Sequence, residues 1–93
     1  MPHRAAAKKS LRQNRKRQLR NKMIKSRLRT EQTRFDRMIE RGDVEAASQQ
    51  ISLLTKLYHR AAARTVIHPN LAARKQTQAQ GRLNNAREQA ATY

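Results

Sequence analysis

The sequence predicts an all-α fold, a three-helix bundle with a long, overhanging basic N-terminal helix. Helix-breaking residues are rare, with two Gly and two Pro among 93 residues. Apolar residues recur three and four positions apart, which is the spacing of an amphipathic helix. Residues 1–30 carry twelve Lys or Arg and no Asp or Glu, whereas residues 31–59 are close to neutral. We therefore expect the core in the middle of the chain and the basic half of the first helix beyond it.

The composition indicates one small domain, residues 1–93, that binds a polyanion. The chain is 37% hydrophobic and 3% aromatic, and its formal net charge is +16. An isoelectric point near 11.8 is typical of a nucleic-acid-binding domain. The absence of Cys excludes a disulfide framework. No apolar run approaches the roughly 18 residues of a membrane helix, and no secretory signal is evident, so we expect a soluble protein that works where it is made, with no membrane partner.

The first helix is expected over about residues 5–41. At 1.5 Å per residue it is near 55 Å long, against about 30 Å for each of the other two. We therefore divide the chain into a basic extension of this helix, residues 1–30, and a bundle core, residues 31–93. The apolar positions that recur at helical spacing in the first helix are Leu19, Met23, Ile24, Leu28, Phe35, Met38 and Ile39.

A tight antiparallel joint is predicted at Gly42-Asp43. Glycine suits the left-handed position just past a helix end. Aspartate suits the N-cap of the following helix, where its carboxylate accepts hydrogen bonds from free N–H groups. The second helix is expected over about residues 43–64, with Tyr58 in the core. Its apolar seam consists of Val44, Ala47, Ile51, Leu54, Tyr58 and Ala61, widened by Leu53 and Leu57.

The third helix is expected over about residues 69–88 and begins at Pro69. Proline is tolerated at the first helical position, and it forces the preceding residue out of helical geometry, so His68 should lie at the N-cap or just before it. Leu71, Ala72, Ala79, Leu83, Ala86 and Ala90 form a weaker apolar stripe. Acidic residues are expected to pair with nearby arginines such as Arg34, Arg37 and Arg41.

Residues 8–29 hold eleven Lys or Arg and no acid. At 100° per residue these side chains surround the helix: Arg17 lies opposite Lys8, and Lys25 fills another quadrant. Like charges three or four positions apart destabilise an isolated helix, so residues 1–20 should be largely unstructured when free and helical when bound. No aromatic residue precedes Phe35, which argues against a stacking platform for single-stranded bases and favours contact with the backbone of folded nucleic acid.

Other classes of protein fit the sequence less well. A zipper-type DNA-binding dimer is disfavoured because the apolar seam folds back at Gly42. A membrane-surface helix needs one apolar face, which the apolar residues before position 30 do not share. His3, His59 and His68 lack the spacing of metal ligands, and no Ser has a convincing catalytic partner. We expect no enzyme activity, no catalytic residue, no metal site, no cofactor and no small-molecule substrate.

The segment IHPNLAARK, residues 67–75, resembles the corresponding segment of the bS20 family of bacterial small-subunit ribosomal proteins. The run AAAKKSLRQNRKR and the central Gly-Asp joint agree with that family. Pro69 departs from it, because the family commonly has a basic residue there. The resemblance implies RNA-facing roles for His68, Asn70, Arg74 and Lys75.

The resemblance also implies a function. It implies a structural constituent of the cytoplasmic small ribosomal subunit, monomeric among the other subunit components. Its main partner would be 16S ribosomal RNA, in the 5′ domain and the long 3′ minor-domain helix. There it would neutralise phosphates and lock the packing of RNA helices during assembly. The alternative is a histone-like or zipper-type DNA-binding protein, because composition alone does not distinguish RNA from DNA.

The residues expected to bind RNA are basic or polar and lie in two stretches, with one addition in the third helix. Forked phosphate contacts are expected from five arginines, Arg12, Arg15, Arg17, Arg20 and Arg27. The full set is Lys8, Lys9, Arg12, Asn14, Arg15, Lys16, Arg17, Arg20, Asn21, Lys22, Lys25, Arg27, Arg29, His68, Asn70, Arg74, Lys75 and Arg82.

Overall fold

A computed structural model describes the backbone of residues 2–92 and the side chains of residues 6–91. It contains three helices, α1 (Pro2–Glu40), α2 (Val44–Ala63) and α3 (Pro69–Thr92), and no strand within the described part of the chain. The predicted all-α three-helix fold is therefore confirmed. The third helix runs past its predicted end at residue 88. Residues 84–92 contain no Gly or Pro and include three alanines, the residue with the highest helix propensity.

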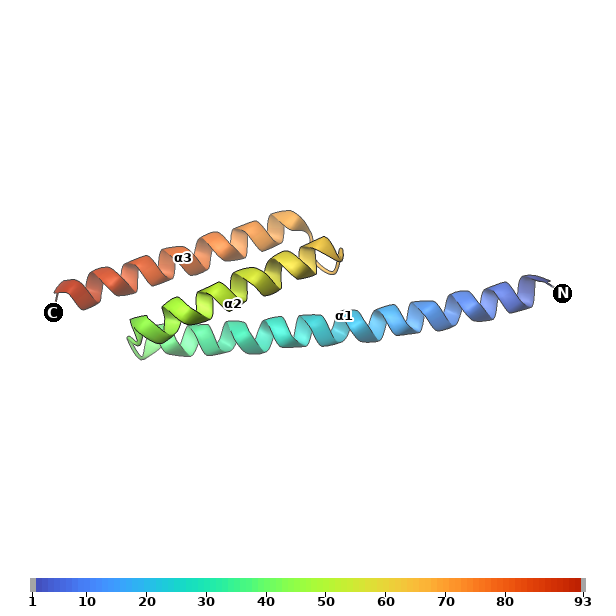
Figure 1. The fold of residues 1–93 in the computed structure, drawn as a ribbon, viewed down its shortest axis with the longest axis horizontal. Helices are drawn as coiled ribbons and strands as arrows, with labels where there is room; N and C mark the ends of the chain where they lie inside the picture. The colour runs from blue at the N-terminus through green and yellow to red at the C-terminus, as the bar shows by residue number, and fades with distance from the viewer. Residues whose placement is uncertain (1, 93) are drawn as a thin grey trace.

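The helices lie in one thin layer with α2 in the middle (Figure 1). α2 packs against both neighbours, whereas α1 and α3 contact each other far less. The Cα atoms extend over 73 × 21 × 14 Å. The N-terminal half of α1 projects from one end of the layer and the last turns of α3 project from the other. The molecule is thus much longer than it is thick.

Each helix contributes one large, fully buried side chain to the core: Phe35 from α1, Leu54 from α2 and Leu83 from α3. Alanines at buried positions of α2 and α3 let the two backbones approach closely, since they add little side-chain volume. The other buried apolar residues are Leu28, Ala47, Ile51, Leu57, Tyr58, Ala61, Ala72 and Ala79. The predicted seam of α2 and the core position of Tyr58 are confirmed.

Three large apolar residues expected in the helical stripes lie outside the core, as does Ala90 near the end of α3. Met23 is 65% exposed, Leu19 is 62% exposed and Leu71 is 39% exposed, so their predicted core positions were wrong. Leu19 and Met23 precede the point where α1 meets α2, and no other helix covers them. At the start of α3, Ala72 rather than Leu71 is the residue that packs into the core.

The joint between α1 and α2 has the predicted form. Gly42 adopts the left-handed conformation with φ of 72°. The N–H groups of Gly42 and Asp43 donate to the carbonyls of Ile39 and Met38 at 3.1 and 3.0 Å, which caps the end of α1. The Asp43 carboxylate accepts a hydrogen bond from the Ala46 N–H at 3.2 Å and caps the start of α2. Two consecutive residues therefore end one helix and begin the next.

The joint between α2 and α3 uses the same hydrogen-bond pattern with a threonine in place of glycine. Thr65 has φ of 58°, a region that β-branched residues rarely occupy. The N–H groups of Thr65 and Val66 donate to Ala62 and Ala61 at 3.0 and 2.9 Å. His68 lies at the N-cap of α3, as predicted, and its Nδ1 accepts from the Asn70 N–H at 3.1 Å.

Side-chain hydrogen bonds join α1 to α2. Buried Glu31 accepts from Arg34 at 3.0 Å, a predicted type of pairing, and from Gln50 of α2 at 2.6 Å. The Tyr58 hydroxyl donates to the Gln32 Oε1 at 2.9 Å, and burial raises the pKa of the Tyr58 phenol.

A second ion pair joins α1 to α3. Asp36 pairs with Arg82, a residue of another helix and not one of the nearby arginines that we expected. The Arg82 guanidinium also lies over the Phe35 ring, 6.0 Å from its centroid. This is one of the few direct links between the outer helices.

Candidate nucleic-acid interface

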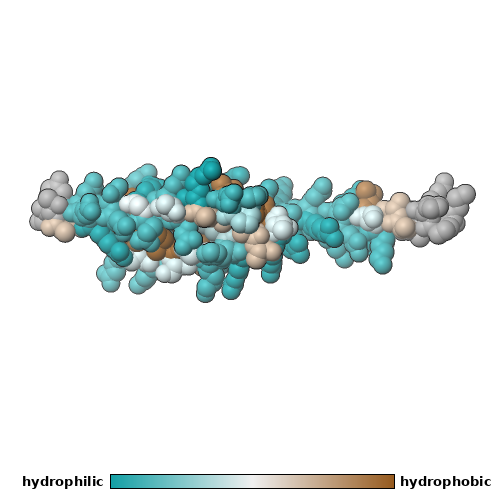
Figure 2. All heavy atoms as spheres, turned by 90° about the horizontal axis from the view of Figure 1, so that it is seen from above, coloured by the Kyte–Doolittle hydropathy of each residue, from teal (hydrophilic) through white to brown (hydrophobic). Residues whose placement is uncertain are grey.

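The projecting part of α1, which we call the overhang (residues 2–23), presents a dense cationic surface. Every described side chain from position 6 to 20 is exposed. Figure 2 shows hydrophilic side chains over most of this end of the molecule, with isolated apolar ones between them. Leu11, an apolar residue of the overhang, is 55% exposed. Residues 6–20 are therefore a helical segment held by its own hydrogen bonds, without packing against α2 or α3.

The cations of the overhang point in all directions around the helix axis. Successive residues of a helix are rotated by 100°, so Lys8 and Arg17 lie on opposite sides and Arg20 lies between them. The overhang contains no acid, and within the described side chains none of its cations forms an ion pair. Their full charge is available to a polyanion.

Polar side chains between the cations add hydrogen-bonding capacity. Asn14 is exposed, whereas Asn21 is half buried where the overhang meets the bundle. The Asn21 Oδ1 is buried and has no hydrogen-bond partner within the protein.

The predicted basic residues beyond the overhang on α1 lie alongside the bundle. Lys25, Arg27 and Arg29 are exposed, but Leu28 between them is buried against α2. The 1–30 segment thus contains both the projecting helix and the first turns that pack into the core.

The residues expected from the 67–75 segment gather at the start of α3. Figure 1 shows this start at the end of the bundle from which the overhang projects. Asn70 and Arg74 are exposed, and Lys75 is half buried. His68 is exposed as well, but its Nδ1 is used to cap α3. The fold therefore brings the two predicted stretches to the same end of the bundle.

Arg82 lies apart from the others. It is near the middle of α3, and its guanidinium pairs with Asp36 and covers Phe35. Part of its charge is thus already neutralised inside the protein. Its position suits a link between helices as well as it suits a contact to phosphate.

Two arginines that the sequence reasoning did not include, Arg60 and Arg64, are exposed near the end of α2. Together with Arg27 they line a cleft between α1 and α2. The signal in the sequence was two arginines four positions apart on a helix whose other charged residues are few. Four positions place both on one face.

Neither a metal site nor a membrane span is found in the part of the chain that the structure describes. No group of three or more His, Cys, Asp or Glu side chains lies close enough to hold a metal ion there. None of the described helices combines the length and the apolar character needed to cross a bilayer.

Comparison with known proteins identifies close relatives. Residues 2–84 match the family described as ribosomal protein S20. The small ribosomal subunit protein bS20 of Aquifex aeolicus is 40% identical over 89 residues, covering 96% of this chain and 95% of its own. The bS20 protein of Natranaerobius thermophilus is 38% identical, covering 91% and 97%. That of Rhodopirellula baltica is 37% identical, covering 97% and 100%.

Proposed function

The chain belongs to the ribosomal protein S20 family, and we propose that it is a structural constituent of the small ribosomal subunit that binds 16S ribosomal RNA directly. Members of a ribosomal protein family are structural proteins, so the chain is not an enzyme. The observation that carries the RNA-binding role is the overhang, whose cations surround a helix that no other part of the protein covers.

The overhang neutralises phosphates from several directions at once. Each Lys or Arg that contacts a phosphate releases condensed counterions, which drives binding. A-form RNA hides the base edges of its deep major groove, so recognition rests mostly on shape and phosphate spacing. Forked phosphate contacts, which a lysine ammonium does not make, come from Arg12, Arg15, Arg17 and Arg20 of the overhang and from Arg27 beyond it. By reducing repulsion between RNA helices, these contacts lock their packing during subunit assembly.

The finer assignments extend the same proposal. The RNA partners are the 5′ domain and the long 3′ minor-domain helix of 16S ribosomal RNA, as the family resemblance implies. The protein acts as a monomer among the other components of the cytoplasmic small subunit. A monomer is favoured by the Gly42-Asp43 joint, because it folds the apolar seam back within one chain and leaves no zipper for a second copy.

Footprinting tests this function. The purified protein is added to full-length 16S ribosomal RNA at moderate salt with excess competitor DNA, and protection of the RNA backbone is mapped. We expect protection confined to a few sites in the 5′ domain and the long 3′ minor-domain helix. Diffuse protection that the DNA abolishes would instead support the alternative, a general DNA-binding or polyanion-binding protein.

A further inference from the structure

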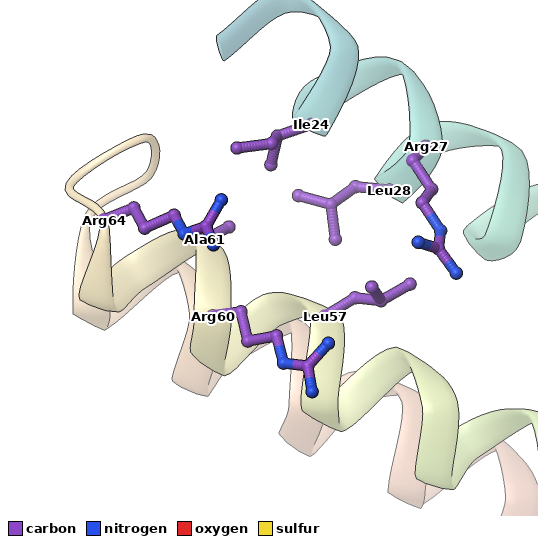
Figure 3. A pocket seen from close by; sticks show the side chains of 7 residues that line it. All are labelled: Ile24, Arg27, Leu28, Leu57, Arg60, Ala61 and Arg64. Carbon is purple, nitrogen blue, oxygen red and sulfur yellow. The ribbon is translucent and has the colours of Figure 1, made fainter. Parts of the chain in front are cut away.

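A cleft of about 270 Å³ lies between α1 and the C-terminal half of α2. Figure 3 shows Ile24 and Leu28 of α1 facing Leu57 and Ala61 of α2 across it. Leu28, Leu57 and Ala61 belong to the buried core, and Ile24 packs against it from the edge. α3 packs mainly against α2, so the cleft stays open between the first two helices.

Three arginines border this apolar floor. Arg27 projects from α1, and Arg60 and Arg64 project from α2 (Figure 3). No acidic residue lines the cleft. Among the described side chains, none of these guanidinium groups forms an ion pair. Three uncompensated cations around an apolar hollow favour a ligand that is anionic at one end and flat and apolar at the other.

We propose that this cleft binds one unstacked nucleotide of the RNA partner, with the base against the apolar floor and its phosphates on Arg27, Arg60 and Arg64. This inference deepens the proposed function and rests on it. The site includes Arg60 and Arg64, which the sequence analysis did not predict to bind RNA.

The chemistry of the cleft selects a nucleotide over a bare phosphate. A site for inorganic phosphate needs polar donors on every side, whereas the floor here is built from Ile, Leu and Ala side chains. The three guanidinium groups at the border of the cleft bind the phosphates, so the base contacts the apolar side chains between them. The volume of the cleft is below that of sites for drug-sized ligands and suits a single ring system.

Methyl NMR of the full-length protein tests the site directly. We expect adenosine 5′-monophosphate and uridine 5′-monophosphate to shift the methyl signals of Ile24, Leu28 and Leu57 saturably in the millimolar range. Ribose 5-phosphate and inorganic phosphate, which lack a base, should leave these signals in place. Arg60→Ala should abolish the nucleotide response. Lys56→Ala removes an exposed cation one turn earlier on α2 and serves as the matched control that keeps the response.

Equal shifts with ribose 5-phosphate would overturn the base-binding role and leave only a phosphate site. Methyl signals that stay unmoved at ten times the expected concentration range would overturn the cleft altogether. Ile24→Glu, which places a carboxylate at the mouth of the cleft and repels a phosphate, provides a second variant. Circular dichroism establishes whether each variant keeps its helices.

Binding to 16S ribosomal RNA separates this inference from the proposed function. We expect Arg60→Ala to weaken the complex about tenfold, the loss of one charge-assisted contact, while Lys56→Ala changes it less than twofold. If the wild-type protein binds the RNA at its expected sites and Arg60→Ala and Ile24→Glu bind equally well, the cleft is not a nucleotide site and the proposed function stands. If the wild-type protein shows no specific RNA protection, the proposed function itself fails.

Discussion

Gly42 and Gly81 occupy opposite backbone environments, and their replacement by alanine should have opposite effects. Gly81 lies inside α3, and a Cβ atom built there meets nothing within 4 Å. Glycine within a helix is less stable than alanine by up to about 1 kcal/mol. We therefore expect Gly81→Ala to raise the melting temperature by about 4–8 °C, measured by circular dichroism.

Gly42→Ala is the matched control for that change. Gly42 also has open space around its Cα, but its φ is 72°, so the added Cβ strains the backbone. We expect this variant to melt at a lower temperature than the wild type. A Gly81→Ala variant that melts no higher than the wild type would show that α3 is frayed at this position.

At the scale of single residues, the sequence was sufficient where the determinant was local. Gly42 and Asp43 are each suited to one conformation, so their roles followed from their identities alone. Thr65 was different, because a β-branched residue normally avoids the left-handed region that it occupies here. Its conformation is imposed by the two capping hydrogen bonds and by the packing of Val66 against the core. The residue types around Thr65 do not indicate that conformation.

At the scale of helices, the overhang lacks the tertiary packing that stabilises most protein helices. Its side chains from position 6 to 20 are all exposed, and many of its like charges are three or four positions apart. We expect residues 1–20 to lack protected amides in the free protein and to gain them on RNA binding, because the binding energy offsets the cost of ordering. Hydrogen exchange followed by NMR measures this.

α2 provides the internal reference for that experiment, since its amides lie in the packed part of the bundle. Protection of residues 6–20 comparable to that of Leu54 in the absence of RNA would contradict the prediction. It would mean that the overhang is a rigid helix before it meets any partner.

The helices themselves were predictable because their apolar periodicity is strong, but the extent of the core was not. Periodicity assigns a residue to a face without showing how far the neighbouring helix reaches. Leu19 and Met23 therefore shared the predicted stripe with Leu28, yet only Leu28 is covered by α2. The cleft that includes Arg60 and Arg64 was not predicted either, because it depends on the relative placement of two helices.

At the scale of the whole molecule, the charge of +16 should govern affinity. Binding to structured RNA should weaken steeply with salt, because each phosphate contact releases counterions. Arg20→Ala should weaken binding to several structured RNAs by similar factors and reduce the slope of log affinity against log salt by about 1. The slope is measured by filter binding over a salt series.

Arg41→Ala provides the control for Arg20→Ala. Arg41 is an exposed arginine at the joint between α1 and α2, at the far end of α1 from the overhang. We expect its loss to leave the slope nearly unchanged. Equal slopes for Arg20→Ala and the wild type would remove Arg20 from the set of phosphate contacts.

Because the overhang is a single helix, its diameter determines the distance between RNA backbones that bind on its opposite sides. Two RNA backbones that touch opposite sides of it are held apart by one helix with its side chains, about 10–12 Å. The protein cations between the two backbones weaken their mutual repulsion, and salt, with a Debye length of about 8 Å at physiological ionic strength, screens the part that acts through solvent. Each backbone still lies in direct contact with protein cations. Under the proposed function, the overhang is a spacer whose thickness, set by helix geometry, fixes how closely two RNA helices approach.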